Sequence, residues 1–297
     1  MSTNLPGLTG NAMYLQHFGL AQYPFSLTPN TKFFLKLPSH QEAFNNLVRA
    51  LLEDGNFSKI VGEVGTGKTI LCRMVLNALG NHPTRFVTAY IPHPILGEDA
   101  LLEAIADELS ITRSKSPQIG ELIKVISTEV NKAADAGKHT ILFIDEAQAI
   151  PEESLNTICL LTQAQTNTKR PLQVILFGQP ELDPLLESPM LSQLKQGIGF
   201  SYSLTPLDRD AVEAYLQHRL AKSGFSGAAL FNAAAVDLLH EASGGIPRTI
   251  NILCHKSLMV AFGKGDRLIT NSHVEKAIAD TEIVAPKKPS WRQRLFS

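Results

Sequence analysis

Residues 62–69 read Gly62-Glu63-Val64-Gly65-Thr66-Gly67-Lys68-Thr69, which is a complete G-x-x-x-x-G-K-T phosphate-binding loop. Its glycines allow backbone N–H groups to converge on phosphate oxygens without a Cβ in the way. We expect Lys68 to reach the β- and γ-phosphates of a nucleotide and the Thr69 hydroxyl to ligate Mg²⁺. The motif therefore predicts a nucleotide site formed by the loop and the residue after it, Ile70.

The segments on either side give this loop the strand–loop–helix context that the motif requires. Before it, residues 57–61 form a short strand-like run. After it, apolar residues mark one face of a helix that Gly80 and Pro83 end: Leu71, Met74, Val75 and Ala78. The N-terminus of that helix would point at the phosphates. An ordinary glycine-rich turn is the alternative, and the flanking segments argue against it.

The composition restricts the class of protein. With 297 residues, 44% of them hydrophobic, the chain can bury a large core and is expected to form two domains. A net charge of −1 and a pI of about 6.8 argue against a surface built for nucleic acid. Without a secretory signal or a stretch of ~18 apolar residues, the chain is expected to be soluble and cytoplasmic. Three widely spaced cysteines are expected to be buried and reduced: Cys72, Cys159 and Cys254.

Strand and helix patterns alternate through the first two thirds of the chain. Ser39 and Glu42 are spaced as a capping box, which predicts the start of a helix. Further strands are expected at 85–91, 140–145, 172–177 and 200–204, and further helices at 99–109, 121–136, 152–165 and 182–195. This alternation predicts an α/β fold with a parallel sheet and right-handed crossovers.

After Pro206 the pattern becomes helical, with helices expected at 208–223, 232–243, 247–262 and 271–281. We therefore expect four parts: a flexible extension (1–13), an α/β nucleotide-binding domain (14–205), an all-helical domain (206–282) and a basic tail (283–297).

Apolar, proline-rich residues near the start of the second part are expected to be irregular. A solvated tail is the favoured interpretation. The alternative is peripheral contact with an anionic membrane or a partner through Trp291, Leu295 and Phe296.

A second motif follows the apolar strand at 141–144, where two carboxylates stand in succession. Asp145 would hold Mg²⁺, through water, beside the phosphate loop. Glu146 would accept a proton from the attacking water. A solvated acidic turn is the alternative for an isolated match, but the phosphate loop about 80 residues upstream favours the catalytic interpretation.

Two further polar residues are candidates. Gln179 follows an apolar strand and could contact the γ-phosphate or position water, although ordinary turn chemistry is nearly as good an explanation. Arg248 follows Gly244-Gly245-Ile246-Pro247 and falls in the first turn of a helix, where a cation opposes the helix dipole. That unfavourable position predicts a functional contact with the nucleotide phosphates, against the alternative of an exposed arginine. The nine histidines lack metal-ligand spacing, so no metal beyond Mg²⁺ is predicted.

Together these elements resemble the Walker A, Walker B, sensor 1 and sensor 2 motifs of AAA+ ATPases. Longer stretches look like the general secretion pathway protein A group, and the short form resembles its members that serve MSHA pilus biogenesis. The stretches that carry this likeness are Tyr14-Leu-x-x-Phe18-Gly-Leu20, Pro24-Phe-Ser-Leu-Thr-Pro29, Asp145-Glu-Ala-Gln148, Phe177-Gly-Gln-Pro-Glu-Leu182 and Gly245-Ile-Pro-Arg-Thr-Ile-Asn251.

The resemblance covers roughly residues 13–282 and implies a P-loop NTPase core with a helical lid. It further implies a homo-oligomer, in the form of a hexameric ring, that uses ATP and Mg²⁺. Such a ring would assemble a type IV-like pilus or secretion machinery with inner-membrane proteins. Lys68, Glu146, Gln179 and Arg248 would then be catalytic. The transmembrane segment and peptidoglycan-binding domain of the secretion-pathway members are not expected here.

One position departs from that group. Where its members read Leu-x-Gln-Arg-Ile, this chain reads Leu194-Lys195-Gln196-Gly197-Ile198. The missing arginine is the natural candidate for a finger inserted into a neighbouring subunit's site, and such a finger is worth orders of magnitude in rate. Lys195 could substitute in part, although it is a point charge rather than a bidentate fork. Alternatively, the finger could come from elsewhere, such as Arg170 or Arg209.

Either hydrolysis is slow or the finger comes from elsewhere, and two alternative functions stay open. One is a nucleotide-switch scaffold that binds ATP and hydrolyses little. The other is a DNA-associated AAA+ regulator of the transposition type, which the near-neutral pI disfavours.

Overall fold

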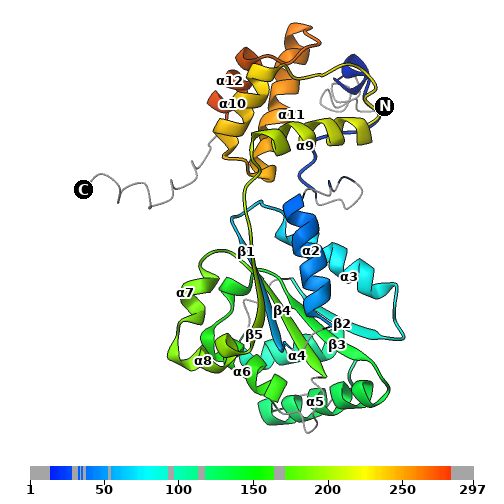
Figure 1. Cartoon of the computed structure of the whole chain (residues 1–297), viewed down its shortest axis with the longest axis vertical. Helices are drawn as coiled ribbons and strands as arrows, with labels where there is room; N and C mark the ends of the chain where they lie inside the picture. Colours follow the sequence, from blue (N-terminus) through cyan, green and yellow to red (C-terminus); the bar gives the residue numbers. More distant parts are fainter. Residues whose placement is uncertain are drawn as a thin grey trace, which may run out of the picture. The chain divides into compact units, whose positions relative to one another are not determined.

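The computed structural model describes residues 14–28, 33, 35, 38–52, 55–92, 97–112, 118–163 and 171–281. Its contacts divide the chain into two units, which are described separately below (Figure 1). One unit runs from Lys36 to Thr205. The other joins residues from Pro206 onward to the segment that ends at Leu35. The expected N-terminal extension and basic tail lie outside the described residues.

A parallel five-stranded sheet forms the centre of the first unit, as predicted, with strand order β2-β3-β4-β1-β5. The strands are β1 (Phe57–Gly62), β2 (Phe86–Ile91), β3 (His139–Ile144), β4 (Leu172–Gly178) and β5 (Ile198–Leu204). Every residue of β4 is buried, which agrees with its near-continuous apolar sequence and with a strand covered on both faces.

Helices cover both faces of this sheet. They are α2 (Pro38–Ala50), α3 (Lys68–Gly80), α4 (Glu98–Glu108), α5 (Ile119–Asp135) and α6 (Glu152–Gln163). Alternate residues of a strand point to opposite faces, so Leu142 joins the core formed with α4, α5 and α6, whereas Phe143 joins the core formed with α2 and α3. The phosphate loop thus lies on a sheet that is anchored from both sides.

Two local predictions in this unit are wrong. The helix expected at 182–195 is broken into α7 (Leu182–Leu186), a 3₁₀ turn η3 (Pro189–Leu191) and α8 (Ser192–Gln196). Proline lacks a backbone N–H and clashes with the preceding turn, so Pro189 starts a new element instead of continuing the old one. The capping box is also wrong, because α2 begins at Pro38 and Ser39 lies inside the first turn.

The second unit contains the four expected helices, α9 (Arg209–Lys222), α10 (Ala233–Ser243), α11 (Pro247–Lys264) and α12 (Asn271–Ala279). Side chains cap three of them: Asp208 accepts a hydrogen bond from Ala211 N, Asn232 accepts one from Ala235 N, and Thr270 and His273 form a capping box at α12. Among the described residues of this unit, strand-type pairing is limited to one parallel bridge between Phe231 and Ile269.

The N-terminal segment packs on these helices rather than on the sheet. Residues 14–18 are helical, where irregular structure was expected. The buried Arg219 of α9 donates from Nε to the Pro24 carbonyl at 2.5 Å, and Tyr14 stacks on Tyr23. The contacts therefore place this segment with the helical unit and not with the nucleotide-binding domain, where the sequence pattern predicts it.

Other predictions from composition can be compared with the described residues. All three cysteines are buried and free, as predicted. In the part of the chain that the structure describes, no helix is long and apolar enough to cross a membrane.

Candidate nucleotide-binding site

The phosphate loop joins the end of β1 to the start of α3. Gly65 and Gly67 adopt left-handed backbone conformations, with φ of 87° and 105°, which glycine tolerates at little cost. At Gly62 the restriction is space, since a Cβ there would lie 2.8 Å from the Thr66 hydroxyl oxygen. The three glycines of the motif are therefore required by the shape of the loop itself.

Lys68 is 5% exposed and turns back onto the loop that precedes it. Its Nζ donates to the carbonyls of Gly62 at 2.8 Å and Glu63 at 3.1 Å. Burial lowers the pKa of the ammonium, and nearby carboxylates, first Glu146 and then Asp145, act in the opposite direction. These bonds satisfy two of the three ammonium donors, so a phosphate oxygen can accept the third.

Thr69 and Asp145 come together from α3 and from the residue after β3. The Thr69 hydroxyl donates to Asp145 Oδ2 at 2.7 Å, and Glu146 N donates to Oδ1 at 3.1 Å. Asp145 is 3% exposed. Burial raises the pKa of its carboxyl, while the bonds from Thr69 and from Glu146 N lower it.

This pair fits Mg²⁺. A divalent cation would offset the burial of an ionised carboxylate, and both groups offer oxygen, the ligand type that Mg²⁺ prefers. Within the described ranges, no cluster of three or more His, Cys, Asp or Glu side chains could hold a metal ion. Mg²⁺ usually keeps several waters and needs only one or two protein ligands, so Thr69 and Asp145 are sufficient.

Glu146 follows Asp145 in a left-handed conformation, with φ of 55° and ψ of 40°. Such a backbone costs on the order of 1–3 kcal/mol in a residue other than glycine, and these outliers cluster at functional sites. Its Oε2 accepts hydrogen bonds from Gln148 Nε2 at 2.7 Å and from Gln179 Nε2 at 2.9 Å. The structure thus brings Gln179, which the sequence left ambiguous, into contact with the expected base.

Two further residues at this site were not predicted. His40 of α2 is buried beneath the loop, and its Nε2 donates to the Thr66 carbonyl at 3.0 Å. Burial lowers the pKa of this imidazole, while the bond to Thr66 acts in the opposite direction. The Tyr90 hydroxyl of β2 reaches Asp145 Oδ2 at 3.4 Å. Neither residue belongs to a motif, since each meets its partner only through the arrangement of α2 and β2 around the loop.

The remaining candidates make none of the hydrogen bonds described above. Arg248 is exposed in the first turn of α11, so its contact with nucleotide stays a prediction. Lys195 bonds to Glu187 at 2.5 Å, and Arg209 pairs with Asp237 at 2.9 Å. Arg170 lies outside the described residues.

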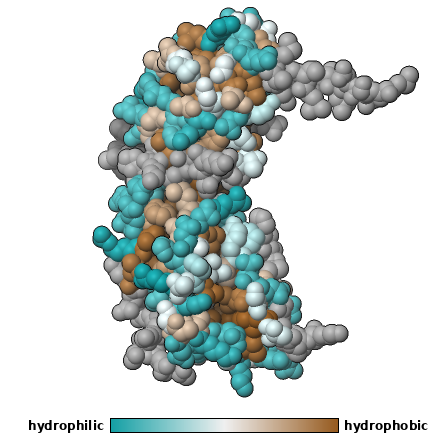
Figure 2. Space-filling view, turned by 90° about the vertical axis from the view of Figure 1, so that its right-hand side faces the viewer, coloured by the Kyte–Doolittle hydropathy of each residue, from teal (hydrophilic) through white to brown (hydrophobic). Residues whose placement is uncertain are grey.

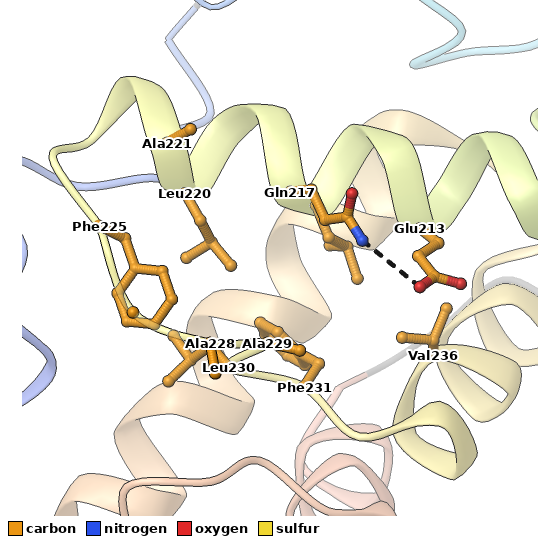
Figure 3. A pocket seen from close by; sticks show the side chains of 12 residues that line it. Glu213, Gln217, Leu220, Ala221, Phe225, Ala228, Ala229, Leu230, Phe231 and Val236 are labelled. Atoms are coloured by element: carbon orange, nitrogen blue, oxygen red, sulfur yellow. Dashed lines mark hydrogen bonds between the residues drawn. The ribbon is translucent and has the colours of Figure 1, made fainter.

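A cavity of about 240 Å³ lies within the helical unit, between α9, the loop at 225–231 and α10 (Figure 3). Its lining is apolar apart from Glu213 and Gln217, which hydrogen-bond to each other at 3.4 Å. A carboxylate in a mostly apolar lining disfavours a phosphate, so this cavity is a poorer candidate for a nucleotide than the glycine-rich loop.

The fold and the loop define the class: a P-loop NTPase fold of the AAA type, which implies nucleotide binding. Residues 50–186 match the family model described as AAA domain. The chain is related in sequence to General secretion pathway protein A of Aeromonas hydrophila, with 40% identity over 284 residues. The match covers 96% of this chain and 51% of that protein, so the chain spans about half the length of this relative.

Solved structures support the fold. The ORC2 protein of Aeropyrum pernix, in ADPNP-ADP complexes, superposes with a TM-score of 0.63 at 16% identity, covering 93% of this chain and 75% of that one. A single-residue variant of RuvB from Thermotoga maritima gives 0.59 at 15% identity, covering 92% and 78%. At these identities the likeness establishes the arrangement of helices and strands alone.

Proposed function

We propose that this chain is an ATPase that binds Mg-ATP and hydrolyses it. One observation carries the proposal: the phosphate loop and the Asp145-Glu146 motif are joined by the 2.7 Å bond from Thr69 to Asp145. This contact supports the proposal, because it joins the residue that would ligate Mg²⁺ after the loop to the motif that holds the expected base.

Each residue then has a role that follows from its chemistry. Backbone N–H groups of residues 62–70 and the Lys68 ammonium bind the phosphate oxygens. Thr69 and Asp145 would hold Mg²⁺, which supplies charge neutralisation to the phosphates when it is bound. Glu146 accepts the proton of the attacking water, and Gln179 orients that carboxylate.

The active form that we propose is a homo-oligomer, a hexameric ring in which Arg248 contacts the phosphates. Large apolar side chains reach the surface of the nucleotide-binding unit and are available to a neighbouring subunit. They include Leu52 at 63%, Val64 at 50%, Leu160 at 46% and Met190 at 48% exposure. Hydrophobic residues are also visible on the face drawn in Figure 2.

In the cell, we propose that the ATPase supports assembly of a type IV-like (MSHA) pilus or a secretion machinery. The relatedness to a secretion-pathway protein supports this role. Its partners would then be inner-membrane assembly proteins, reached from the cytoplasm by peripheral association. Deleting the gene and counting surface pili or secreted protein tests the role. Restoration by the parent chain and not by Glu146→Gln is the expected result, and equal restoration by both would refute an ATP-driven role.

The chemistry is tested by measuring nucleotide binding and phosphate release with three variants. Lys68→Ala should weaken ATP binding by at least about tenfold, because it removes a charged donor to phosphate. Glu146→Gln should retain binding and lose about 10²–10⁴-fold in turnover, since it removes the base. Lys132→Ala is the matched control, because this exposed lysine pairs with Glu129 away from the loop. Loss of binding in all three, or in none, would contradict the assignment.

The departure at Gly197 favours one alternative, a nucleotide switch that assembles with ATP and turns over little. The parent chain would then bind ATP in this assay and release almost no phosphate.

A further inference from the structure

We infer that Gln148 is a positioning residue that holds the Glu146 carboxylate and ties it to the end of β4. This inference rests on the proposed function of Glu146 as the base. Gln148 lies in the 3₁₀ turn η2 (Ala147–Ala149), which follows the Asp145-Glu146 motif directly.

The hydrogen bonds around Gln148 form a closed triangle of three residues. Gln148 Nε2 donates to Glu146 Oε2 at 2.7 Å, and Gln179 Nε2 donates to the same oxygen at 2.9 Å. The third side is the bond from the backbone N–H of Gln179 to Gln148 Oε1, at 2.9 Å. Gln148 therefore uses both ends of its amide, one on the carboxylate and one on the neighbouring strand end.

The direction of the Gln148 amide follows from its partners. A backbone N–H can only donate, so the oxygen end of Gln148 must face Gln179 N. The NH₂ end then faces the carboxylate, which is an acceptor when it is ionised. The hydrogen-bond pattern is thus consistent with the charged form of Glu146, the form that can accept a proton.

The backbone explains why Glu146 needs such support. Its backbone is in the left-handed conformation, with φ of 55°, so the side chain starts from a strained turn. Rotation of that side chain is restrained only by the groups that it contacts. Both amide donors bind Oε2, and an ionised carboxylate has about four lone-pair sites, so the group can still accept a proton from water. Gln148 and Gln179 restrain the base without using up its acceptor capacity.

The end of β4, where Gln148 binds, requires a glycine at position 178. A Cβ on Gly178 would lie 2.7 Å from Leu182 Cδ2 and 3.4 Å from Gln148 Oε1. Because β3 and β4 are adjacent parallel strands, the residues after them lie at the same edge of the sheet. Gln148 bridges these two strand ends.

The first test separates catalysis from binding by comparing kcat, KM and the Kd for ATP in Gln148→Met and the parent. Methionine keeps the length of the side chain and removes both hydrogen bonds. We expect kcat to fall at least about tenfold, since misplacing a catalytic group by about 1 Å is enough for such a loss. The Kd for ATP should change less than about twofold. An unchanged or faster kcat, or a loss confined to Kd, would overturn the inference.

The pH dependence of kcat provides a second test, because a residue with only a structural role would leave the shape of this profile unchanged. Gln148→Glu places a carboxylate where an amide N lies 2.7 Å from Glu146 Oε2. Like charges at this distance raise the pKa values of the pair. The charged groups that interact with Glu146 include Asp145 and Lys68, and the variant leaves both unchanged. The acidic limb of kcat should therefore move to higher pH.

The control for that profile is Gln163→Glu. Gln163 is exposed on α6 and forms a hydrogen bond with Gln193. The Gln163→Glu substitution therefore adds the same charge at a different place on the protein. Its pH profile should match the parent. A shift of equal size in both variants, or in neither, would contradict a local effect on Glu146.

The ¹³C NMR signal of the Glu146 carboxyl, assigned by its loss in Glu146→Gln, separates this inference from the proposed function. A parent without turnover would refute the proposed ATPase, and this signal would still decide the positioning. Removing the Gln148 donor should change the chemical shift of the Glu146 carboxyl in Gln148→Met and not in Gln163→Glu. A signal in Gln148→Met that coincides with the parent would show that Gln148 does not hold this carboxylate.

Discussion

At Asp145, burial raises the pKa of the carboxyl because the charged form loses hydration, although Thr69 and Glu146 N donate hydrogen bonds to it. Ionised Asp145 therefore destabilises the nucleotide-free fold at neutral pH. This penalty disappears as the pH falls through the raised pKa. The same burial makes the carboxylate a favourable partner for a cation, which agrees with the proposed role of Asp145 in holding Mg²⁺.

Replacing Asp145 with asparagine tests whether the buried charge destabilises the nucleotide-free fold. We expect Asp145→Asn to raise the Tm of the nucleotide-free protein at neutral pH by a few degrees, because the buried charge is gone. It should also abolish the further rise that Mg-ATP gives the parent. Thermal unfolding with and without Mg-ATP measures both effects. A lower Tm in the variant would show that Asp145 stabilises the fold, contrary to this account.

His40 gives the loop a pH dependence of opposite direction. Its folded-state pKa is lowered from 6.5 by burial, so the unfolded chain binds more protons below that pH. The stability contributed by neutral His40 is complete above the unfolded pKa and is lost as the pH falls below it.

His40→Gln keeps an amide donor for the Thr66 carbonyl and cannot titrate. Between about pH 7 and pH 5, we expect the free energy of unfolding to fall more steeply in the parent than in the variant. The difference is at most about 1.4 kcal/mol per pH unit. Denaturant titrations across this range measure it, and parallel slopes would exclude His40 as the source.

At the scale of elements, the strands could be predicted because their causes are local. The apolar run of β4 and the four apolar residues before Asp145 are typical of buried parallel strands, and both form as expected. The break at Pro189 was missed because the helix-like apolar spacing around it was given more weight than the proline.

The phosphate loop and the Asp145-Glu146 motif were predictable because their chemistry requires fixed residue types at fixed spacing. The role of Gln148 was not, although the residue stands in a recognisable stretch. It contacts Gln179, 31 positions away, and His40 contacts Thr66 across 26 positions. These contacts depend on which strands are neighbours and on which helix covers the loop, and local pattern does not specify either.

The N-terminal segment offers a prediction at the same scale. Arg219 donates to the Pro24 carbonyl and to the Tyr215 hydroxyl, and its guanidinium lies 5.0 Å from the centre of the Phe33 ring. Arg219→Met keeps the packing of the stem and removes these bonds, so we expect a loss of about 2 kcal/mol.

Hydrogen exchange of residues 14–28 measures this loss, and exchange should accelerate there in Arg219→Met. Lys222→Met on the same helix is the control, because Lys222 is exposed and its side chain lies outside that cluster. Equal exchange in the two variants would mean that Arg219 does not anchor the segment.

In the oligomer that we propose, Gly197 is the position where an arginine finger was expected from the sequence. Its φ of −77° suits any residue, and an added Cβ would lie 3.0 Å from Phe57 Cδ2, which requires a shift of a few tenths of an ångström. A side chain at this position therefore requires the buried Phe57 ring to shift, and the Leu194 carbonyl oxygen would lie 3.3 Å from the same Cβ.

If Gly197 stands where a finger is missing, Gly197→Arg should raise turnover by at least about tenfold, since such arginines are worth far more in related chemistry. Gly197→Ala controls for the added Cβ, and Gly197→Lys for charge without a bidentate fork. The same turnover in all three variants would place the finger elsewhere.

Whether this chain is a self-assembling ATPase can be decided by measuring ATP turnover per subunit as a function of protein concentration, in the parent and in Glu146→Gln. We predict that turnover rises cooperatively with concentration in the parent and is lost in the variant, which should still bind ATP. Turnover per subunit that is independent of concentration, or that survives in Glu146→Gln, would contradict a site completed by a neighbouring subunit and served by Glu146.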